Sequence, residues 1–337
     1  RDMAVLYRAS YVTRNIEETF SGAKVTYAIY SGVQFFDREE IKNALAYLRM
    51  AVYRDDLSFL RIANLPKRNL GKRRMEFLTE KAANTGQSLY DTLVSNLDDE
   101  IFKGTKAAKF VKLIESFSTG WDGRPVSELL CELLDKSGYE ELLRTEGSQI
   151  RLDNLAELKQ AVHEYEVTSG EESTPEHYIR HAALFTNSDT ASPGDKVRLM
   201  TVHSAKGLEF PYVFLVSMNE GIFPSRKTAT RSAMEEERRL AFVALTRAKR
   251  GLYLSEGEGT GHDGSPRYPS RFIFDIDRQL LDITRSPSSA LENEARDYIQ
   301  KSVKYLAPDL GSALFKNGQR VRHSVFGEGT VIDVDMD

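Results

Sequence analysis

The sequence of 337 residues is long enough for two domains, each with its own hydrophobic core. Its hydrophobic fraction of 41% and charged fraction of 28% are typical of soluble globular proteins, and no apolar run approaches the ~18 residues that span a bilayer. A net charge of −4 excludes a general attraction for nucleic acid over the whole chain, but it is compatible with local basic patches. The single Cys131 excludes an internal disulfide and a Cys-based zinc site, and no signal peptide opens the chain, so we expect a cytoplasmic protein with no membrane partner.

The first part of the chain alternates between strand and helix patterns. Apolar runs predict strands at residues 4–8 and 24–30, with a helix at residues 10–20 between them. Asp37 and Glu40 have the spacing of a capping box, with Asp in place of Ser or Thr, so a second helix is predicted to begin there. The apolar face of that helix consists of Ile41, Leu45 and Leu48.

The middle of the chain shows only helical periodicity, from about residue 50 to 185, which predicts a helical domain. Strands resume at residues 197–202, 212–218 and 252–256, and their near-continuous apolar character predicts a parallel sheet covered on both faces. The two strands at the start would form too small a sheet on their own. The sequence therefore predicts an α/β domain that takes strands from both ends of the chain and is interrupted by an all-helical insertion.

The last part of the chain changes character again. Polar residues after about 285 predict a linker with one helix. The final stretch NGQRVRHSVFGEGTVIDVD alternates apolar and polar residues around Gly327 and Gly329, which is typical of a β-hairpin. A segment this short cannot close a barrel, so we expect the truncated beginning of a small β module.

The polar segment TVHSAKGLEF, residues 201–210, lies between two apolar strands. In open parallel sheets, ligands bind beyond the carboxyl ends of the strands, and we expect His203 and the residues after it to lie there. Lys206 and Gly207 are suited to a phosphate, and Glu209 to a ribose hydroxyl. Residue types alone leave an ordinary surface loop equally open.

A helix is predicted in SAMEEERRLAFVALTRAKRG, residues 232–251. Ser232 and Glu235 have capping-box spacing, and Gly251 is predicted to end the helix in a left-handed conformation. Arg247 continues the apolar stripe of this helix, where a guanidinium is costly unless an anion meets it. Two interpretations stay open from the residues: a structural arginine paired with a carboxylate, or an arginine finger directed at a phosphate.

These segments resemble motifs V and VI of the UvrD/PcrA/Rep helicases of superfamily 1. The resemblance is carried by VRLMTVHSAKGLEFPYVFLVSMNEGIFPS and EEERRLAFVALTRAK, and AVLYRAS, GVQFFDREEIKNALAYLRM and PSRF match the same family in the same order. It implies a second RecA-like domain (2A) interrupted by a helical domain (2B). The implied domains are 2A at 1–48 and 190–285, 2B at 49–189, a linker at 286–314, and a truncated Tudor-like module at 315–337.

The resemblance also assigns roles to individual residues. It implies that Arg247 is the catalytic arginine finger, that Glu209 contacts the ribose of ATP and that Gly207 lies near the phosphates. It further implies a path for single-stranded DNA bordered by Arg8, Thr201, His203 and Phe223.

The basic turn LPKRNLGKRR, residues 65–74, is predicted to join two helices. In the family the corresponding helix–turn–helix carries Gly-x-Gly and touches duplex DNA, so Lys67, Arg68, Gly71 and Lys72 are expected to contact phosphates. The first glycine is Asn69 here, which adopts a left-handed conformation less readily. A solvated basic turn without a ligand is the alternative.

Two motifs of the family's nucleotide site are absent from the sequence. It contains neither G-x-x-x-x-G-K-[ST] nor an apolar strand ending in Asp-Glu to hold magnesium. We therefore expect a missing N-terminal RecA-like domain in an intact ATP-dependent helicase that moves 3′ to 5′ and uses ATP with Mg²⁺. The chain alone is expected to be inactive. Expected partners are single-stranded DNA, single–double-strand junctions, and repair or transcription proteins.

Two alternatives stay open. One is a helicase–nuclease subunit of the AddA/RecB kind, which shares motifs V and VI. The other is a non-catalytic DNA- or protein-binding module.

Overall fold

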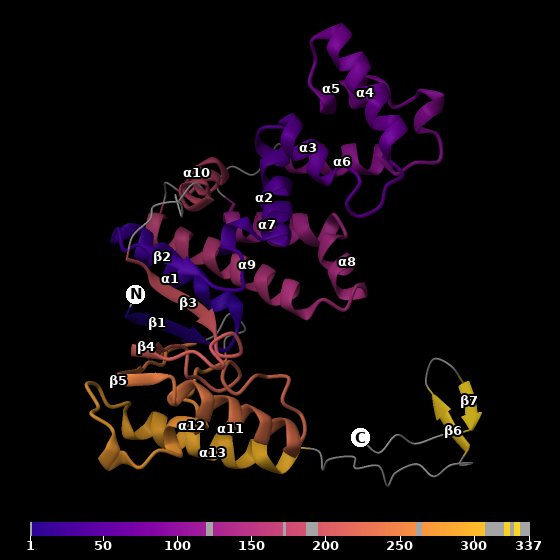
Figure 1. Ribbon diagram of the computed structural model, residues 1–337. Coiled ribbons are helices and arrows are strands. Elements are labelled where there is room, and N and C mark those ends of the chain that lie inside the picture. The colour runs from indigo at the N-terminus through magenta and orange to yellow at the C-terminus, as the bar shows by residue number, and fades with distance from the viewer. Residues whose placement is uncertain are drawn as a thin grey trace. The chain divides into compact units, whose positions relative to one another are not determined.

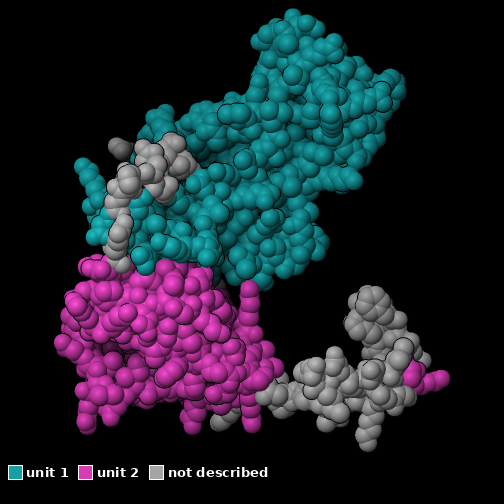
Figure 2. Space-filling model, viewed as in Figure 1, with its two compact units in different colours: residues 1, 10–199 teal, residues 2–9, 200–337 magenta. Residues whose placement is uncertain are grey.

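The computed structural model describes residues 2–118, 124–170, 173–186, 195–260, 265–306, 320–323 and 327–330. The chain divides into two compact units: residues 10–199 with residue 1, and residues 2–9 with 200–337 (Figure 2). The predicted 2A and 2B boundaries refer to the family's domains and stay a prediction. Within the described ranges, no helix is long and apolar enough to cross a membrane.

A five-stranded parallel sheet has the order β2-β3-β1-β4-β5, so strands from both ends of the chain alternate in it (Figure 1). Its strands are β1 (Met3–Tyr7), β2 (Tyr27–Ile29), β3 (Val197–Thr201), β4 (Phe210–Leu215) and β5 (Ala248–Leu254). Met3 pairs with Tyr212, and Tyr212 pairs with Gly251. The predicted α/β fold, with strands drawn from both ends of the chain, is confirmed.

A set of helices begins between β1 and β2 and continues after β2, as the periodicity predicts. They are α1 (Thr13–Gly22), α2 (Glu39–Val52), α3 (Asp56–Ile62), α4 (Lys72–Thr85), α5 (Leu89–Ser95), α6 (Ala107–Ser118), α7 (Val126–Lys136), α8 (Tyr139–Thr145), α9 (Gln149–Ser169) and α10 (Pro175–Thr186). The long helix α2 lies in the core of this unit, where Ile41, Tyr47 and Leu48 are fully buried. Its predicted capping box is wrong, because Asp37 lies in a preceding 3₁₀ helix (Phe35–Asp37) and pairs with Lys42 at 2.6 Å.

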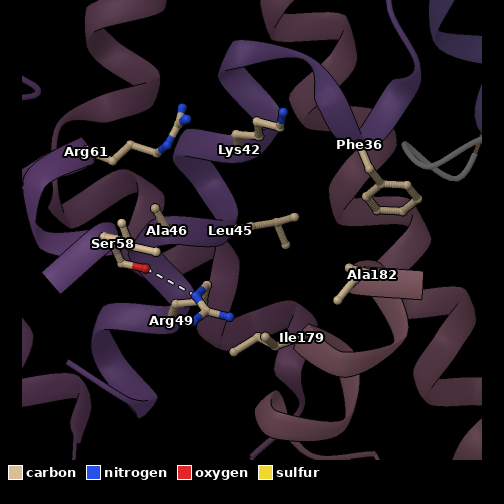
Figure 3. Close-up of a pocket in the computed structure, with 11 residues that line it drawn as sticks. Phe36, Lys42, Leu45, Ala46, Arg49, Ser58, Arg61, Ile179 and Ala182 are labelled. Atoms are coloured by element: carbon tan, nitrogen blue, oxygen red, sulfur yellow. Dashed lines mark hydrogen bonds between the residues drawn. The ribbon is translucent and has the colours of Figure 1, made fainter. Parts of the chain in front are cut away.

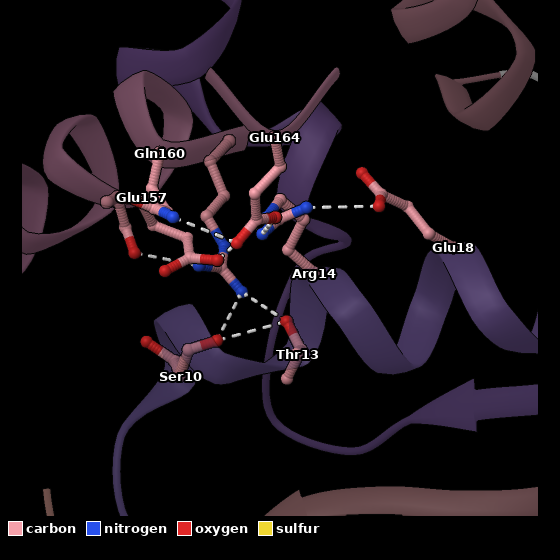
Figure 4. Close-up of polar contacts among 9 residues, drawn as sticks. Ser10, Thr13, Arg14, Glu18, Glu157, Gln160 and Glu164 are labelled. Carbon is pink, nitrogen blue, oxygen red and sulfur yellow. Dashed lines mark hydrogen bonds and ion pairs between the residues drawn. The ribbon is translucent and has the colours of Figure 1, made fainter. Parts of the chain in front are cut away.

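A buried arginine joins α1 to α9 within this unit (Figure 4). The guanidinium of Arg14 lies 3.0 Å from Glu18, 2.7 Å from Glu157 and 2.6 Å from Glu164. Burial opposes its charge, but the carboxylates outweigh burial and raise the pKa of Arg14. The same burial raises the pKa of Glu18, whose charge Arg14 favours. The cluster therefore fixes α1 against α9, on either side of the predicted 2A–2B boundary.

The other unit holds α11 (Arg231–Leu245), α12 (Arg271–Phe274) and α13 (Ser289–Tyr305). The expected ends of α11 are wrong: Thr230 rather than Ser232 caps it by accepting a hydrogen bond from the Ala233 amide, and the helix stops at Leu245. Gly251 lies within β5 because the residues from Ala248 onward pair with β4 instead of continuing the helix.

The polar stretch after residue 285 contains α13, which Ser288 caps through its side chain. Beyond it, β6 (Arg320–His323) and β7 (Gly327–Thr330) form an antiparallel pair, which confirms the predicted hairpin. Residues 307–319 and 331–337 lie outside the described part of the chain, and the Tudor-like assignment stays a prediction.

Candidate functional site

The loop between β3 and β4 runs from the carboxyl ends of the parallel strands to their amino ends. These two ends of the sheet are called the carboxyl edge and the amino edge below. β3 ends at Thr201 and β4 begins at Phe210 in a parallel sheet, so Thr201 and His203 lie at the carboxyl ends of the strands and Glu209 at an amino end. The expectation that the whole segment 201–210 gathers beyond the carboxyl ends is therefore wrong, because a parallel crossover must return the chain to the other edge. The predicted residues fall into two groups.

Arg247 belongs to the amino-end group, in the connection between α11 and β5. Its Nε donates to the carbonyl of Val243 at 2.9 Å, its Nη1 to the carbonyl of Leu208 at 3.0 Å, and its Nη2 to the hydroxyl of Thr246 at 2.9 Å. These partners are neutral oxygens, so among the described residues no carboxylate hydrogen bond neutralises the guanidinium. The first of the two interpretations of Arg247, a structural arginine paired with a carboxylate, therefore has no support among the described residues.

The hydrogen bond from Arg247 to Leu208 brings together the three residues predicted to bind nucleotide. Gly207 and Glu209 flank Leu208 in the loop. Gly207 has a φ of +83°, and a Cβ added there would meet no atom within 4 Å, so its backbone is open to a ligand. The carboxylate of Glu209 lies 3.1 Å from Nζ of Lys249, with the two side chains 53% and 56% exposed. Such an exposed pair contributes only about 0–1 kcal/mol, and a ligand can replace it.

Arg8 follows β1 at the carboxyl edge, where Glu237 of α11 holds it. Nε of Arg8 lies 3.0 and 3.1 Å from the two carboxylate oxygens, and Nη2 lies 2.6 Å from Oε1. Glu237 is nearly buried and also accepts a hydrogen bond from the Ser225 amide at 3.1 Å. Glu237 was not singled out in the sequence from the other two glutamates of residues 235–237. The signal was its helical spacing with the apolar residues, which turns it toward the core.

His203 and Thr201 lie at the same edge. His203 is exposed, and Thr201 accepts a hydrogen bond from the Ser204 amide at 3.2 Å, which shapes the turn that presents His203. Partial burial lowers the pKa of His203, Arg8 lowers it further, and Glu237 partly offsets both. The imidazole is therefore electrostatically linked to the ion pair between Arg8 and Glu237.

Phe223, expected to border the same DNA path, is a core residue in the structure. Its side chain is fully buried and makes an edge-to-face contact with Phe272 at a centroid distance of 5.4 Å. Its carbonyl accepts a hydrogen bond from the hydroxyl of Ser270. The ring therefore has no exposed surface on which a DNA base could stack in this conformation, because it is packed in the apolar core.

The basic turn between α3 and α4 is organised by a side chain rather than by glycine. The side-chain oxygen of Asn64 accepts hydrogen bonds from the amides of Arg68 at 2.8 Å and Leu70 at 3.1 Å. Asn69 adopts the left-handed conformation with a φ of +61°. Gly71 precedes α4, and no atom lies within 4 Å of a Cβ added there.

The two lysines of this turn lie at the surface. Lys67 is exposed, and the Lys72 side chain is 90% exposed, with Glu76 at 3.8 Å as a weak partner. Both are therefore accessible to phosphate.

The expectation that Arg68 contacts DNA is contradicted by its burial. Only 6% of Arg68 is exposed, and its Nη1 donates to the carbonyls of Ile62 at 2.8 Å and Leu65 at 2.7 Å. Its Nη2 donates to the hydroxyl of Tyr47 at 2.8 Å, and the guanidinium lies 4.8 Å from the ring centroid of Phe110. A buried guanidinium needs many acceptors, and the end of α3 supplies carbonyls. Arg68 supports the turn from inside.

The fold is that of an α/β protein in which a RecA-like parallel sheet is combined with a helical insertion. The loops at the ends of its strands carry cationic and polar residues. The chain belongs to the UvrD-like helicase C-terminal domain family, which matches residues 1–259.

Relatives of known name are similar over almost all of the chain. It is 37% identical over 358 residues to the ATP-dependent DNA helicase PcrA of Bacillus subtilis (strain 168), an alignment that covers 99% of this chain and 48% of the relative. It is 33% identical over 347 residues to DNA helicase II of Escherichia coli (strain K12), with the same coverages of 99% and 48%. The ATP-dependent DNA helicase PcrA of Staphylococcus aureus (strain Mu50) is 34% identical over 354 residues, covering 99% and 48%. The chain thus spans about half the length of these relatives.

Proposed function

We propose that this chain forms one face of the ATP site and part of the single-stranded DNA path of an ATP-dependent DNA helicase that moves 3′ to 5′. Membership of the family supports the activity class. The observation that carries the proposal is the guanidinium of Arg247, which lies against the loop of Gly207 and Glu209 and, within the described part of the chain, donates its hydrogen bonds to neutral oxygens. A guanidinium supported in this way keeps its full charge for an anionic ligand.

The residues at the amino edge fit one face of a nucleoside triphosphate. Arg247 would donate to phosphate oxygens and stabilise the charge that develops in phosphoryl transfer. Glu209 would accept from a ribose hydroxyl after releasing Lys249, and Gly207 would allow close approach of the backbone. Magnesium accompanies ATP in this proposal, but the described residues contain no group of three His, Cys, Asp or Glu suited to a metal ion, so no step through the metal is assigned to them.

Hydrolysis needs a second face of the site. The sequence lacks a P-loop motif, so in this proposal another RecA-like domain supplies the phosphate cradle. Closure of the two domains around ATP brings Arg247 to the phosphates, and their opening after hydrolysis advances the protein along one strand. The chain alone should hydrolyse no ATP.

The carboxyl edge would contact single-stranded DNA through Arg8, Thr201 and His203. Helix α11 links the two edges, because Glu237 in this helix holds Arg8 and Arg247 follows its last turn. In the helical unit, the exposed Lys67 and Lys72, with the backbone at Gly71, would hold the duplex phosphates of a junction. Repair or transcription proteins are further partners in this proposal.

The catalytic assignment is tested by DNA-stimulated ATP hydrolysis with the chain joined to a P-loop domain. Arg247→Ala should lower kcat by about 10³-fold or more with little change in KM, since the arginine acts on transition-state charge. Arg250→Ala removes an exposed arginine of β5 and is the matched control. A kcat within tenfold of the unaltered protein in Arg247→Ala would exclude the arginine finger.

The duplex contact is tested by binding of the chain to a duplex with a single-stranded tail at several salt concentrations. Lys67→Glu with Lys72→Glu should weaken binding and make the salt dependence shallower, by about 0.9 in log–log slope for each lost phosphate contact. Lys112→Glu, an exposed change on α6 in the same unit, serves as the control. A loss of affinity in Lys112→Glu about half as large in log Kd as that of the double variant would mean that overall charge explains the effect, since the control makes half the charge change.

A further inference from the structure

A groove on the helical unit lies outside every site described above (Figure 3). Its floor is apolar and comes from α2, α10 and the 3₁₀ helix before α2, with Leu45, Ile179, Ala182 and Phe36 facing the cavity. Its volume is about 220 Å³. That lies below the ~300–1,000 Å³ of small-molecule sites, and it suits an apolar side chain better than a whole cofactor.

One wall of the groove is an exposed leucine. Leu57 of α3 is 81% exposed, and Leu60, one turn further along the same helix, is 52% exposed. A single exposed leucine is ordinary, but a leucine at the mouth of an apolar cavity forms a continuous surface that a partner can cover.

Basic side chains surround this floor. Among the described residues, Lys42, Arg49 and Arg61 are the charged ones that line the groove, and none of its lining residues there is a carboxylate. Lys42 and Arg49 have carboxylate partners behind the rim, Asp37 at 2.6 Å and Asp55 at 3.1 Å. Their side chains are still 39% and 40% exposed, so their outer faces are available.

Arg61 is exposed and donates to the side-chain oxygen of Asn43 at 3.1 Å, which is a neutral partner. An apolar slot with a cationic rim is complementary to an apolar anchor flanked by carboxylates.

We infer that this groove docks an acidic amphipathic helix of a partner protein, with apolar anchors in the slot and Asp or Glu against the rim. The mode is that of a helix in a groove, in which residues one turn apart provide the anchors. Single-stranded DNA fits less well, because bases stack on exposed aromatic rings and Phe36, the aromatic residue of the lining, is only 2% exposed. The inference is independent of the proposed ATP and DNA sites.

The test uses two fluorescein-labelled helical peptides and the whole 337-residue chain. In one peptide, two leucines four residues apart are flanked by glutamates; in the other, each glutamate is replaced by lysine. Fluorescence anisotropy should give a Kd at least tenfold lower for the glutamate peptide. Leu57→Asp and Arg61→Glu should each raise that Kd at least tenfold, and higher salt should raise it further.

The matched controls are Leu280→Asp and Arg285→Glu, which change a 79% exposed leucine and an 84% exposed arginine side chain of the other unit. They should leave peptide affinity unchanged, and circular dichroism should show all variants folded. Equal affinity for the two peptides, or affinity indifferent to Leu57→Asp, overturns the inference. Competition by a single-stranded oligonucleotide also overturns the inference if the binding of that oligonucleotide is lost in Arg61→Glu and kept in Leu57→Asp. The basic rim would then bind nucleic acid rather than a helix.

Discussion

Replacing Arg68 by alanine should destabilise the helical unit rather than only weaken DNA binding. The guanidinium makes three short hydrogen bonds, to the carbonyls of Ile62 and Leu65 and to the hydroxyl of Tyr47, at 2.7–2.8 Å. Hydrogen bonds to a charged group contribute about 1.5–3 kcal/mol each, but they share one side chain and do not add fully. The carbonyls of Ile62 and Leu65 keep a second donor each, the Leu65 amide and the Tyr47 hydroxyl, so the loss comes from the bonds and the packing of the guanidinium itself. We therefore expect a loss of about 3–5 kcal/mol.

Thermal unfolding followed by circular dichroism at 222 nm measures this loss. For a unit of this size each kcal/mol lowers Tm by about 2–4 °C, so Arg68→Ala should melt roughly 6–20 °C lower. Lys67→Ala, the exposed neighbour in the same turn, should stay within about 0.5 kcal/mol of the unaltered chain. If Arg68→Ala melted like Lys67→Ala and instead lost salt-dependent DNA binding, the structural role derived from its burial would be refuted.

Two further changes test the sheet and its carboxyl edge. Gly251→Ala should destabilise the chain by about 1–2 kcal/mol, because its Cβ would lie 2.8 Å from Cδ1 of Tyr212, and the lower entropy of the unfolded chain offsets only part of that strain. Arg8→Met should raise the pKa of His203 toward its ordinary value of 6.5, and Glu237→Gln should lower it further, as NMR titration of the imidazole can show. Since the folded pKa is the lower one, protonation of His203 opposes folding, and the stability present above its ordinary pKa is lost as pH falls from that value through the lower folded pKa.

Each of these predictions has its own contradicting result. Gly257→Ala is the control for the first, because its nearest atoms to a new Cβ lie at 3.5 and 3.8 Å, which is ordinary contact. Equal Tm values for the two alanine variants would mean that Tyr212 moves aside freely. A His203 pKa that ignores both Arg8→Met and Glu237→Gln would show that burial alone sets it.

The strands of the sheet could be predicted because each is a run of apolar residues. The residue at which α11 ends could not be predicted. The residues after Leu245 continue a helical pattern with basic residues and a glycine in the expected places. Pairing with β4 determines their conformation instead, and nothing local in the sequence records a partner strand so distant in the chain. Gly251 is needed because its backbone lies close to Tyr212. In the sequence, a glycine at this position looks like the residue that ends a helix.

Burial of polar residues was the second feature that sequence could not give. Arg68 lies among basic residues that are exposed, so composition assigns it to the surface with them. Its acceptors include the carbonyls at the end of α3 and, weakly at 3.3 Å, that of Ser137, which only the fold brings near. Glu237 differs from Arg68 in this respect: its helical spacing with the apolar residues of α11 indicates burial, but only the fold shows that Arg8 is its partner.

The two ion pairs at opposite edges of the sheet differ in a way that bears on their use. Glu209 and Lys249 are both more than half exposed, so exchanging this pair for a ligand costs little. Glu237 is only 8% exposed and binds Arg8 through two nitrogens, so separating them would leave a carboxylate with little solvent. In the function that we propose, a nucleotide would displace Lys249 from Glu209 at little cost, whereas DNA would meet Arg8 with Glu237 still bound to it. The amino edge would therefore exchange its ligand readily, whereas the carboxyl edge would keep a fixed geometry.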